Sequence, residues 1–444
     1  MSKLKRLTVL SIIIVTQTVL AIFIAGIILA GNSAGRILPG VTSAGVPLGR
    51  LSPEKAEEVL RERFGGLENG SLVLEGEGRQ WIIPMKDIGA VYDYREAVKK
   101  AYAVGHWGWI VRRISEQLRN RTGGTEVPLS VKFNQEAMEK ELDKINREYT
   151  KKPQNARLTL KGGKVNLVSC LDGREMDVTE TLRRIMELRA GAVPRVTIAS
   201  KPVSPRIKDQ DLSGLTDVLG ECSTRFESYS EGRIKNIARA AGQIDGILVK
   251  PGEIFSFNRH ISPIDEQGGY QKAPVIIDDQ LVDDYGGGVC QVSTTLYGAA
   301  LLSGLEVVER HPHSRPVKYV PPGLDATVAE GLMDFRFKNN LDWPVYIITS
   351  TEPANGYVKI TIVGHKEQNT IYKIETAVKT IPPGIVMKSN SRLKPGQTNN
   401  ISEGSPGFDV SVFRVLVFEG GKVRRDLISN DYYPPDPKII EVGF

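Results

Sequence analysis

The sequence predicts a multidomain α+β protein with a single N-terminal membrane helix and a β-rich C-terminal module. A chain of 444 residues exceeds what one hydrophobic core supports. Helical patterns alternate with short apolar runs up to residue 366, and after it the helical patterns vanish. Hydrophobic residues make up 41% of the chain and charged residues 25%, which is typical of folded proteins and excludes a disordered one.

The membrane helix is expected over residues 7–30, which carry no charge. Such a run is long enough to cross a hydrocarbon core of about 30 Å, whereas a cleaved signal peptide has an apolar stretch of about 7–15 residues. Basic residues within the tail 1–6 are expected to stay in the cytoplasm. The sequence therefore predicts a signal anchor in the cell membrane, with the bulk of the chain extracytoplasmic. Cleavage near "AGNSAG" is the alternative.

Residues 31–50 are rich in Gly, Pro and Ser and are expected to form a stalk. Residues 51–205 then show a duplicated α+β unit of helix, hairpin and helix. Ser52 and Asn134 are expected to cap the first helix of each copy, and Asp93 and Asp177, 84 residues apart, the second. Between the copies lies the segment "GHWGWIVRRISEQLRNR", which has an apolar and a basic side. We expect it to be a packing helix, or a helix that lies on a membrane or glycan surface.

Residues 206–366 combine turn signals and short apolar runs with one strong helical pattern, from Gln291 to Ser303, stopped by Gly304. Cys290 stands immediately before this helix. A thiol at a helix N-terminus has a lowered pKa, and the thiolate is the nucleophilic form. The preceding glycines, 286–288, are expected to let a substrate backbone approach and to present N–H groups to an oxyanion.

A base is available downstream in "ERHPHSRP", where His311 and His313 stand two apart and are expected to share a face. Asp325 would orient an imidazole. The order Cys, His, Asp is similar in role to thiol hydrolases and transglutaminase-like enzymes. The alternative is structural: free cysteine often packs as a small hydrophobe. Two weaker options are a metal ion at the histidines with Asp325 or His260, and Glu253 as an acid for glycan cleavage.

Charge and cysteine count limit the partners. A net charge of +6 and a pI near 9.0 suit an anionic membrane surface or wall polymer. No basic-aromatic platform is present, so no nucleic-acid partner is expected, and no motif calls for a cofactor or a metal. Three cysteines leave at least one thiol without a partner in the chain.

Long motifs carry a family resemblance. "LVKPGEIFSFN", "GGGVCQVSTTLYGAALLSGLEVVERHPHSRPVKYVPPGLDATV" and "FRFKNNLDWPVYI" resemble the VanW-like family. The duplicated region resembles the peptidoglycan-binding module of the YoaR-like type. Residues 367–444, with Gly396, Gly404, Gly407 and the "GGK" hairpin, resemble the five-glycine module of cell-wall proteins.

The resemblance implies a bacterial envelope protein associated with glycopeptide-resistance genes, and no settled reaction. Within the motif it points to these positions for ligand binding or catalysis: Gly286, Gly287, Gly288, Cys290, Gln291, Ser293, Thr294, His311, His313, Ser314 and Arg315. Two functions follow as hypotheses. The first is a protein that binds peptidoglycan or its precursors near the membrane, in glycopeptide resistance or wall maintenance. The second is a cysteine-dependent hydrolase or transpeptidase that acts on wall peptides.

Overall fold

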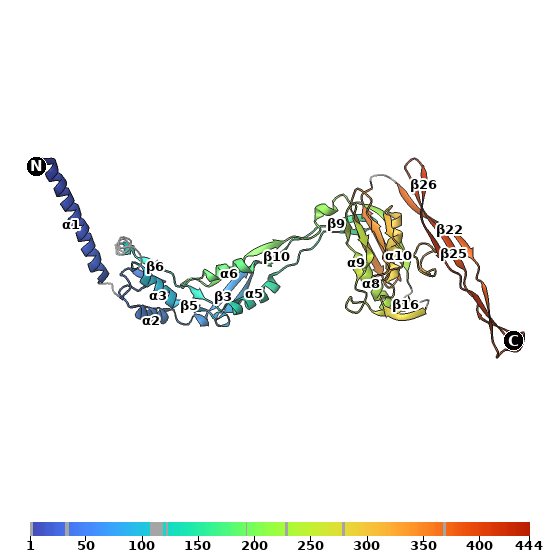
Figure 1. Ribbon diagram of the computed structural model, residues 1–444, viewed down its shortest axis with the longest axis horizontal. Helices are drawn as coiled ribbons and strands as arrows, with labels where there is room; N and C mark the ends of the chain where they lie inside the picture. Colours follow the sequence, from blue (N-terminus) through green and yellow to red (C-terminus); the bar gives the residue numbers. More distant parts are fainter. Residues whose placement is uncertain are drawn as a thin grey trace. The chain divides into compact units, whose positions relative to one another are not determined.

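The computed structural model describes residues 3–31, 35–106, 119–120, 123–191, 193–226, 230–277, 280–366 and 370–444 (Figure 1). Most of the segment expected as a helix between the two copies, 105–121, lies outside these ranges. The chain forms two compact units. The first unit comprises Met1–Gln154 and Asp172–Ser204, and the second comprises Asn155–Leu171 and Pro205–Phe444.

Helix α1 (Lys3–Gly31) occupies the position of the expected membrane span. Apolar side chains from Val9 to Ile24 are exposed along it. The hydroxyls of Thr16 and Thr18 donate to carbonyl oxygens one turn earlier, as threonine side chains often do inside helices. Within the described ranges, no helix combines the length and the apolar content that crossing a membrane requires.

The residues expected as a stalk are instead largely part of a folded core. Ile37, Leu38 and Leu48 are buried among the apolar faces of helices α2 (Pro53–Phe64) and α3 (Tyr94–Ala103). Strand β1 (Val41–Ser43) pairs with β2 (Val46–Pro47) and, in parallel, with β6 (Thr125–Val127). The apolar residues scattered between the glycines decide the outcome, because burying them stabilises the chain more than a solvated stalk would.

All four predicted helix caps are confirmed. Ser52, Asp93, Asn134 and Asp177 each accept a hydrogen bond from the backbone N–H three residues later. They begin α2, α3, α5 (Gln135–Tyr149) and α6 (Val178–Met186) respectively. Capping depends only on local sequence, which is why these positions follow from the residue pattern alone.

The first hairpin does not pack with its own helices. Strands β3 (Ser71–Gly76) and β4 (Arg79–Pro84) form a sheet with β11 (Arg195–Thr197) and share a core with α5 and α6 of the second copy. The first unit is completed by short elements: η1 (Leu67–Asn69), η2 (Met85–Ile88), β5 (Val91–Tyr92) paired with β7 (Val131–Lys132), and β10 (Gly173–Met176) paired with β12 (Ser200–Val203).

The second hairpin, β8 (Arg157–Lys161) and β9 (Lys164–Val168), belongs to the second unit. Leu158 shares a small core with Leu212 of α7 (Asp209–Leu212) and with Tyr346 and Val363. Each duplicated hairpin thus packs in a core with elements that follow it in the chain. The sequence pattern did not indicate this arrangement.

The main core of the second unit lies between a sheet and two helices (Figure 1). The antiparallel sheet has the order β13 (Asp217–Arg225), β21 (Tyr357–Gly364), β20 (Val345–Glu352) and β14 (Leu248–Val249). Helices α8 (Glu231–Ile244) and α10 (Val289–Leu302) pack against it. Tyr297, Phe335 and Phe337 are fully buried in this core.

A smaller sheet and a hairpin complete this region. The sheet has the order β15 (Ile254–Ser256), β19 (Arg336–Lys338) and β18 (Glu306–Glu309), and helix α9 (Phe257–Ile261) follows β15. The hairpin joins β16 (Lys272–Ile277) to β17 (Gln280–Tyr285), and β17 leads directly to the start of α10.

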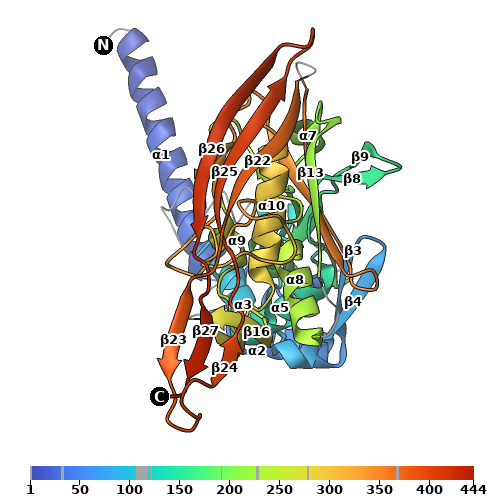
Figure 2. The ribbon, with the colours of Figure 1, turned by 90° about the vertical axis from the view of Figure 1, so that its right-hand side faces the viewer.

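The C-terminal module is made of two three-stranded sheets (Figure 2). Long strands β22 (Ile371–Ile381), β25 (Gly407–Val417) and β26 (Val423–Tyr433) form one, and β23 (Ile385–Ser389), β27 (Lys438–Val442) and β24 (Thr398–Ser402) the other. The predicted hairpin is confirmed, with Gly420 and Gly421 in left-handed conformations. A Cβ at Gly323 would lie 2.8 Å from Val410 and Val412, so the loop before residue 325 packs closely on β25.

Candidate thiol site at the start of helix α10

The three glycines before α10 form a tightly packed turn. Gly286 and Gly288 have φ angles of 82° and 108°, which side chains rarely adopt. A Cβ on Gly286 would lie 2.3 Å from Ile264, and one on Gly287 would lie 2.8 Å from Ala273. All three glycines are buried. They accommodate neighbouring protein atoms, which contradicts the expectation that they leave room for a substrate backbone.

Replacing Gly286 with alanine is expected to destabilise the protein by about 2–5 kcal/mol. The left-handed conformation costs about 1–2 kcal/mol, and overpacking a core adds about 1–3 kcal/mol. Gly252→Ala is the matched control, because Gly252 has a φ of 77° but open space around a Cβ. Urea denaturation would measure both variants, and equal losses would show that the contact with Ile264 is unimportant.

Cys290 is the second residue of α10 and is half-buried. Its sulfur lies 3.5 Å from the carbonyl oxygen of Val328 and 3.6 Å from the hydroxyl of Thr327. The unpaired N–H groups of the first helical turn place partial positive charge beside it. The prediction that the thiol stands at a helix start is therefore confirmed.

The pairing of two chain segments brings His313 and Asp325 together. The backbone N–H of Thr327 donates to the carbonyl of His311 at 2.8 Å, in an antiparallel bridge. The same register places His313 opposite Asp325, two residues further along each segment. Asp325 Oδ2 accepts from the backbone N–H of His313 at 2.7 Å and from its ring Nδ1 at 2.6 Å.

Asp325 is only 1% exposed, so its carboxylate holds the imidazole in one tautomer, with Nδ1 protonated. The other ring nitrogen is left for the Cys290 thiol, whose pKa the ring of His313 lowers. Burial lowers the pKa of His313, but hydrogen bonds to Asp325 and Cys290 outweigh it and raise the pKa to about 9. Burial raises the pKa of Cys290, but the hydrogen bond and charge of His313, together with hydrogen bonds to Val328 and Thr327, outweigh burial and lower this pKa. A thiol with a lowered pKa beside an imidazole with a raised pKa favours a thiolate–imidazolium pair.

His311 does not join this group. Its Nε2 lies 3.1 Å from a carboxylate oxygen of Glu309, and its side chain is 40% exposed. Glu309 in turn accepts from the backbone N–H of Asp334 at 3.1 Å. The two histidines were expected to share a face, and the structure gives them different partners.

Three polar residues of the motif serve the fold around Cys290. Gln291 is buried, and its amide group bonds Arg233, Thr224 and the carbonyl of Arg225. The hydroxyls of Ser293 and Thr294 both donate to the carbonyl of Ala326 and so hold the segment after Asp325 against α10. They position the site and are too buried to meet a ligand.

Ser314 and Arg315 follow His313 and are exposed. Arg315 pairs with Asp436 of the C-terminal module at 2.9 Å.

The structure adds residues that sequence reasoning missed. Tyr319 lies close enough to Cys290 that burial, and then the charge of the thiolate, raise its pKa. Arg310 and Tyr433 both contact Asp325. Nothing in "RPVKYVPP" singles out Tyr319, and Tyr433 is 108 residues from Asp325, so no local signal points to these contacts.

The other options find less support. All three cysteines are free thiols, so no bridge consumes Cys290. Glu253 is exposed and accepts from the backbone N–H of Lys250 at 3.0 Å, as a turn residue does. Throughout the part of the chain that the structure describes, His, Cys, Asp and Glu side chains form no group of three that is placed to hold a metal ion.

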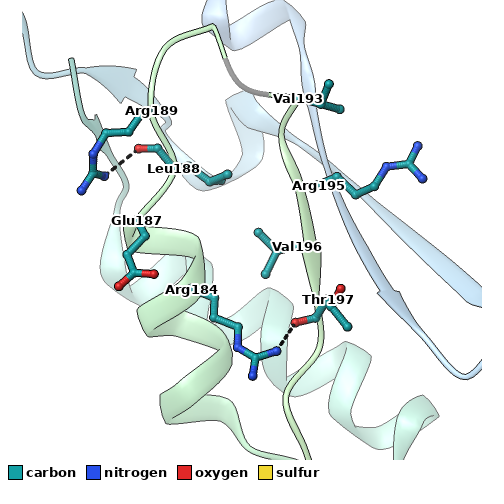
Figure 3. Close-up of a pocket in the computed structure, with 8 residues that line it drawn as sticks. All are labelled: Arg184, Glu187, Leu188, Arg189, Val193, Arg195, Val196 and Thr197. Atoms are coloured by element: carbon teal, nitrogen blue, oxygen red, sulfur yellow. Dashed lines mark hydrogen bonds between the residues drawn. The ribbon is translucent and has the colours of Figure 1, made fainter. Parts of the chain in front are cut away.

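The first unit contains an open hollow of about 400 Å³ between α6 and β11 (Figure 3). Its lining combines charged and apolar side chains: Arg184, Glu187, Leu188, Arg189, Val193, Arg195, Val196 and Thr197. The arginines already have protein partners, since Arg184 bonds the carbonyl of Thr197 at 3.0 Å and Arg195 pairs with Glu75. These two arginines are therefore already engaged by neighbouring protein groups.

Three family models match the chain in successive regions. The model described as "Putative peptidoglycan binding domain" matches residues 81–196, "VanW like protein" matches residues 232–363, and "G5 domain" matches residues 372–444. The chain thus carries a VanW-like domain with a peptidoglycan-binding domain before it and a G5 domain after it. Cys290, His313 and Asp325 lie in the VanW-like domain, and Tyr433 lies in the G5 domain.

Two curated proteins are similar to this chain. The "Uncharacterized protein YoaR" of Bacillus subtilis (strain 168) is 37% identical over 193 residues, which are 43% of this chain and 63% of YoaR. The "Vancomycin B-type resistance protein VanW" of Enterococcus faecalis (strain ATCC 700802 / V583) is 31% identical over 155 residues, 33% of this chain and 54% of VanW. The chain therefore covers less than two thirds of either relative.

Among solved structures, one titled "IgA1 Protease G5 domain structure" is 26% identical. The match covers 18% of this chain and 95% of the solved chain, with a TM-score of 0.16.

Proposed function

We propose that this chain, with its peptidoglycan-binding, VanW-like and G5 regions, is a cell-envelope protein that attaches to peptidoglycan and transfers acyl groups of wall peptides through Cys290. The observation that carries the catalytic part is the hydrogen bond of His313 to the buried Asp325, beside a thiol whose pKa the imidazole lowers. Cys290 would be the nucleophile, His313 the base and Asp325 the carboxylate that orients the base, which is the set of groups that acyl transfer requires. The two flanking regions support the choice of wall peptides as the substrate class.

The residues divide the reaction as follows. The Cys290 thiolate attacks the carbonyl carbon of a peptide bond, and the imidazolium of His313 gives its proton to the leaving amine. The amine departs and a thioester remains on Cys290. Water, or the amine of a second peptide, then attacks the thioester while His313 takes up the proton. Asp325 keeps the ring oriented in both steps, and the backbone N–H of Cys290 at the helix start would stabilise the oxyanion.

Placement outside the cytoplasm and attachment to the membrane through residues 7–30 are part of this proposal. They rest on the sequence, namely the uncharged run and the basic residues before it. Peptidoglycan is the polymer within reach of a protein held there. One relative is named for vancomycin resistance, so glycopeptide resistance or wall maintenance is the setting that we propose.

The test is to incubate the full chain, purified in detergent, with peptidoglycan and to analyse the peptide fragments by mass spectrometry. Cys290→Ala is expected to lower the rate of cleavage or exchange by about 10³-fold or more. Cys222→Ala is the matched control, since Cys222 is a free thiol whose pKa is raised by burial to about 11. Sedimentation with the wall by all three proteins and no change in the peptides would reject catalysis and leave a wall-binding protein. Loss of sedimentation would reject wall attachment.

A further inference from the structure

The last residue of strand β26 reaches the carboxylate that orients the catalytic imidazole. Tyr433 is fully buried although it belongs to the C-terminal module. Its hydroxyl donates to Asp325 Oδ1 and accepts from the backbone N–H of Gly323 at 2.9 Å. Both hydrogen bonds of the hydroxyl are therefore made to the segment that carries Asp325.

A second residue of the same strand supports Asp325 through Arg310. The guanidinium of Arg310 donates to the backbone carbonyl of Asp325 at 2.6 Å, to that of Gly323 at 3.1 Å, and to a carboxylate oxygen of Asp431. Asp431 is itself held at its other oxygen by the hydroxyl of Ser429 at 2.9 Å. Arg310, Asp325 and Asp431 have side chains no more than 5% exposed, so these bonds are not weakened by water.

Both oxygens of Asp325 are thus fixed. Oδ2 receives the two N–H groups of His313, and Oδ1 receives the hydroxyl of Tyr433 and, at 3.3 Å, the guanidinium of Arg310. A carboxylate held at one oxygen alone rotates easily, whereas one held at both keeps a single plane. The plane of Asp325 decides where the ring of His313 points.

We propose that Tyr433 is a positioning residue of the thiol site, so that the C-terminal module completes the catalytic group in addition to any role in wall binding. This inference rests on the proposed function for the identity of the reacting groups. Its physical content, that Tyr433 sets the reactivity of Cys290, does not depend on the substrate.

The experiment compares Tyr433→Phe with Tyr432→Phe in the full chain. Tyr432 is the neighbouring residue and is 61% exposed, which makes it the matched control. Alkylation of each cysteine by iodoacetamide is followed by mass spectrometry of the peptides between pH 5 and pH 10. No wall material is used, so a failed wall assay and a failed positioning role are separate results.

Tyr433→Phe is expected to slow alkylation of Cys290 at neutral pH by about 10-fold, because Asp325 loses a hydrogen bond that a charged carboxylate makes strongly. In this variant the rise of the Cys290 alkylation rate with pH, on the acid side of the profile, is expected to move to higher pH. The reason is that a less firmly held imidazolium stabilises the thiolate less. Tyr432→Phe is expected to follow the wild type.

The alkylation rate of Cys222 in the same samples shows whether packing of the whole fold has loosened, because its thiol is packed against Gly298. The proposal is overturned if, in Tyr433→Phe, the acid side of the pH profile for Cys290 alkylation stays in place or moves to lower pH. Faster alkylation of Cys222 together with slower alkylation of Cys290 would also overturn it, because the effect would then be one on folding.

Discussion

Arg310→Met is expected to lower the free energy of unfolding by about 3–5 kcal/mol. The guanidinium lies between the carboxylates of Asp325 and Asp431, and all three side chains are no more than 5% exposed. Removing the cation leaves two buried anions and two carbonyl oxygens without their donor, and the loss of one partner from a buried pair costs about that much. Methionine keeps most of the side-chain volume, so the change isolates the charge. Urea denaturation would measure it.

Arg315→Met is the control for this prediction. Arg315 also pairs with an aspartate of the C-terminal module, Asp436 at 2.9 Å, but its side chain is 45% exposed. An exposed pair contributes about 0–1 kcal/mol. If the two variants lost equal stability, burial of the Arg310 network would not be what makes it important.

His313→Gln is expected to slow alkylation of Cys290 at pH 6.5 by about 100-fold. The imidazolium beside the sulfur lowers the pKa of Cys290 in the native protein. An unassisted thiol has a pKa of about 8.5, and only about 1% of it is thiolate two pH units lower. Burial without the imidazolium disfavours the thiolate further. Iodoacetamide labelling with peptide mass spectrometry checks this directly.

His311→Gln is the matched control, because His311 bonds Glu309 and not the sulfur. It is expected to leave the labelling of Cys290 unchanged. Equal labelling of the wild type and His313→Gln at pH 6.5 would show that His313 does not activate the thiol. Slow labelling of His311→Gln would reverse the assignment of the two histidines.

The raised pKa of His313 also sets the upper limit of the pH range. The imidazolium is present below about pH 9 and is lost as the pH rises through that value. In the proposed reaction the leaving amine takes its proton from the imidazolium, so acyl transfer is expected to decline above about pH 9. The fall on the acid side should follow protonation of Cys290, whose pKa is lowered. The proposed activity is therefore expected over a pH range that includes neutral pH.

The sequence by itself determined features that depend on neighbouring residues. The four helix caps, the stop of α10 before Gly304, the glycine hairpin at residues 420–421 and the helix-start position of Cys290 all follow from local chemistry. Caps and turns are decided within three or four residues by backbone hydrogen bonds and allowed φ angles. The residue types of the site, a thiol, an imidazole and a carboxylate, were identified from their chemical roles and their order in the chain.

Tertiary structure alone decided which of these residues meet. The register between residues 311 and 327 selected His313 over His311, and packing buried the three glycines. Packing also buried the apolar residues of the expected stalk in a core. It placed each duplicated hairpin against the part of the chain that follows it. Tyr433 and Asp431 reach Asp325 and Arg310 across more than a hundred residues. Such contacts depend on how whole elements bury their apolar faces, and this global balance of burial is not encoded in any short stretch of sequence.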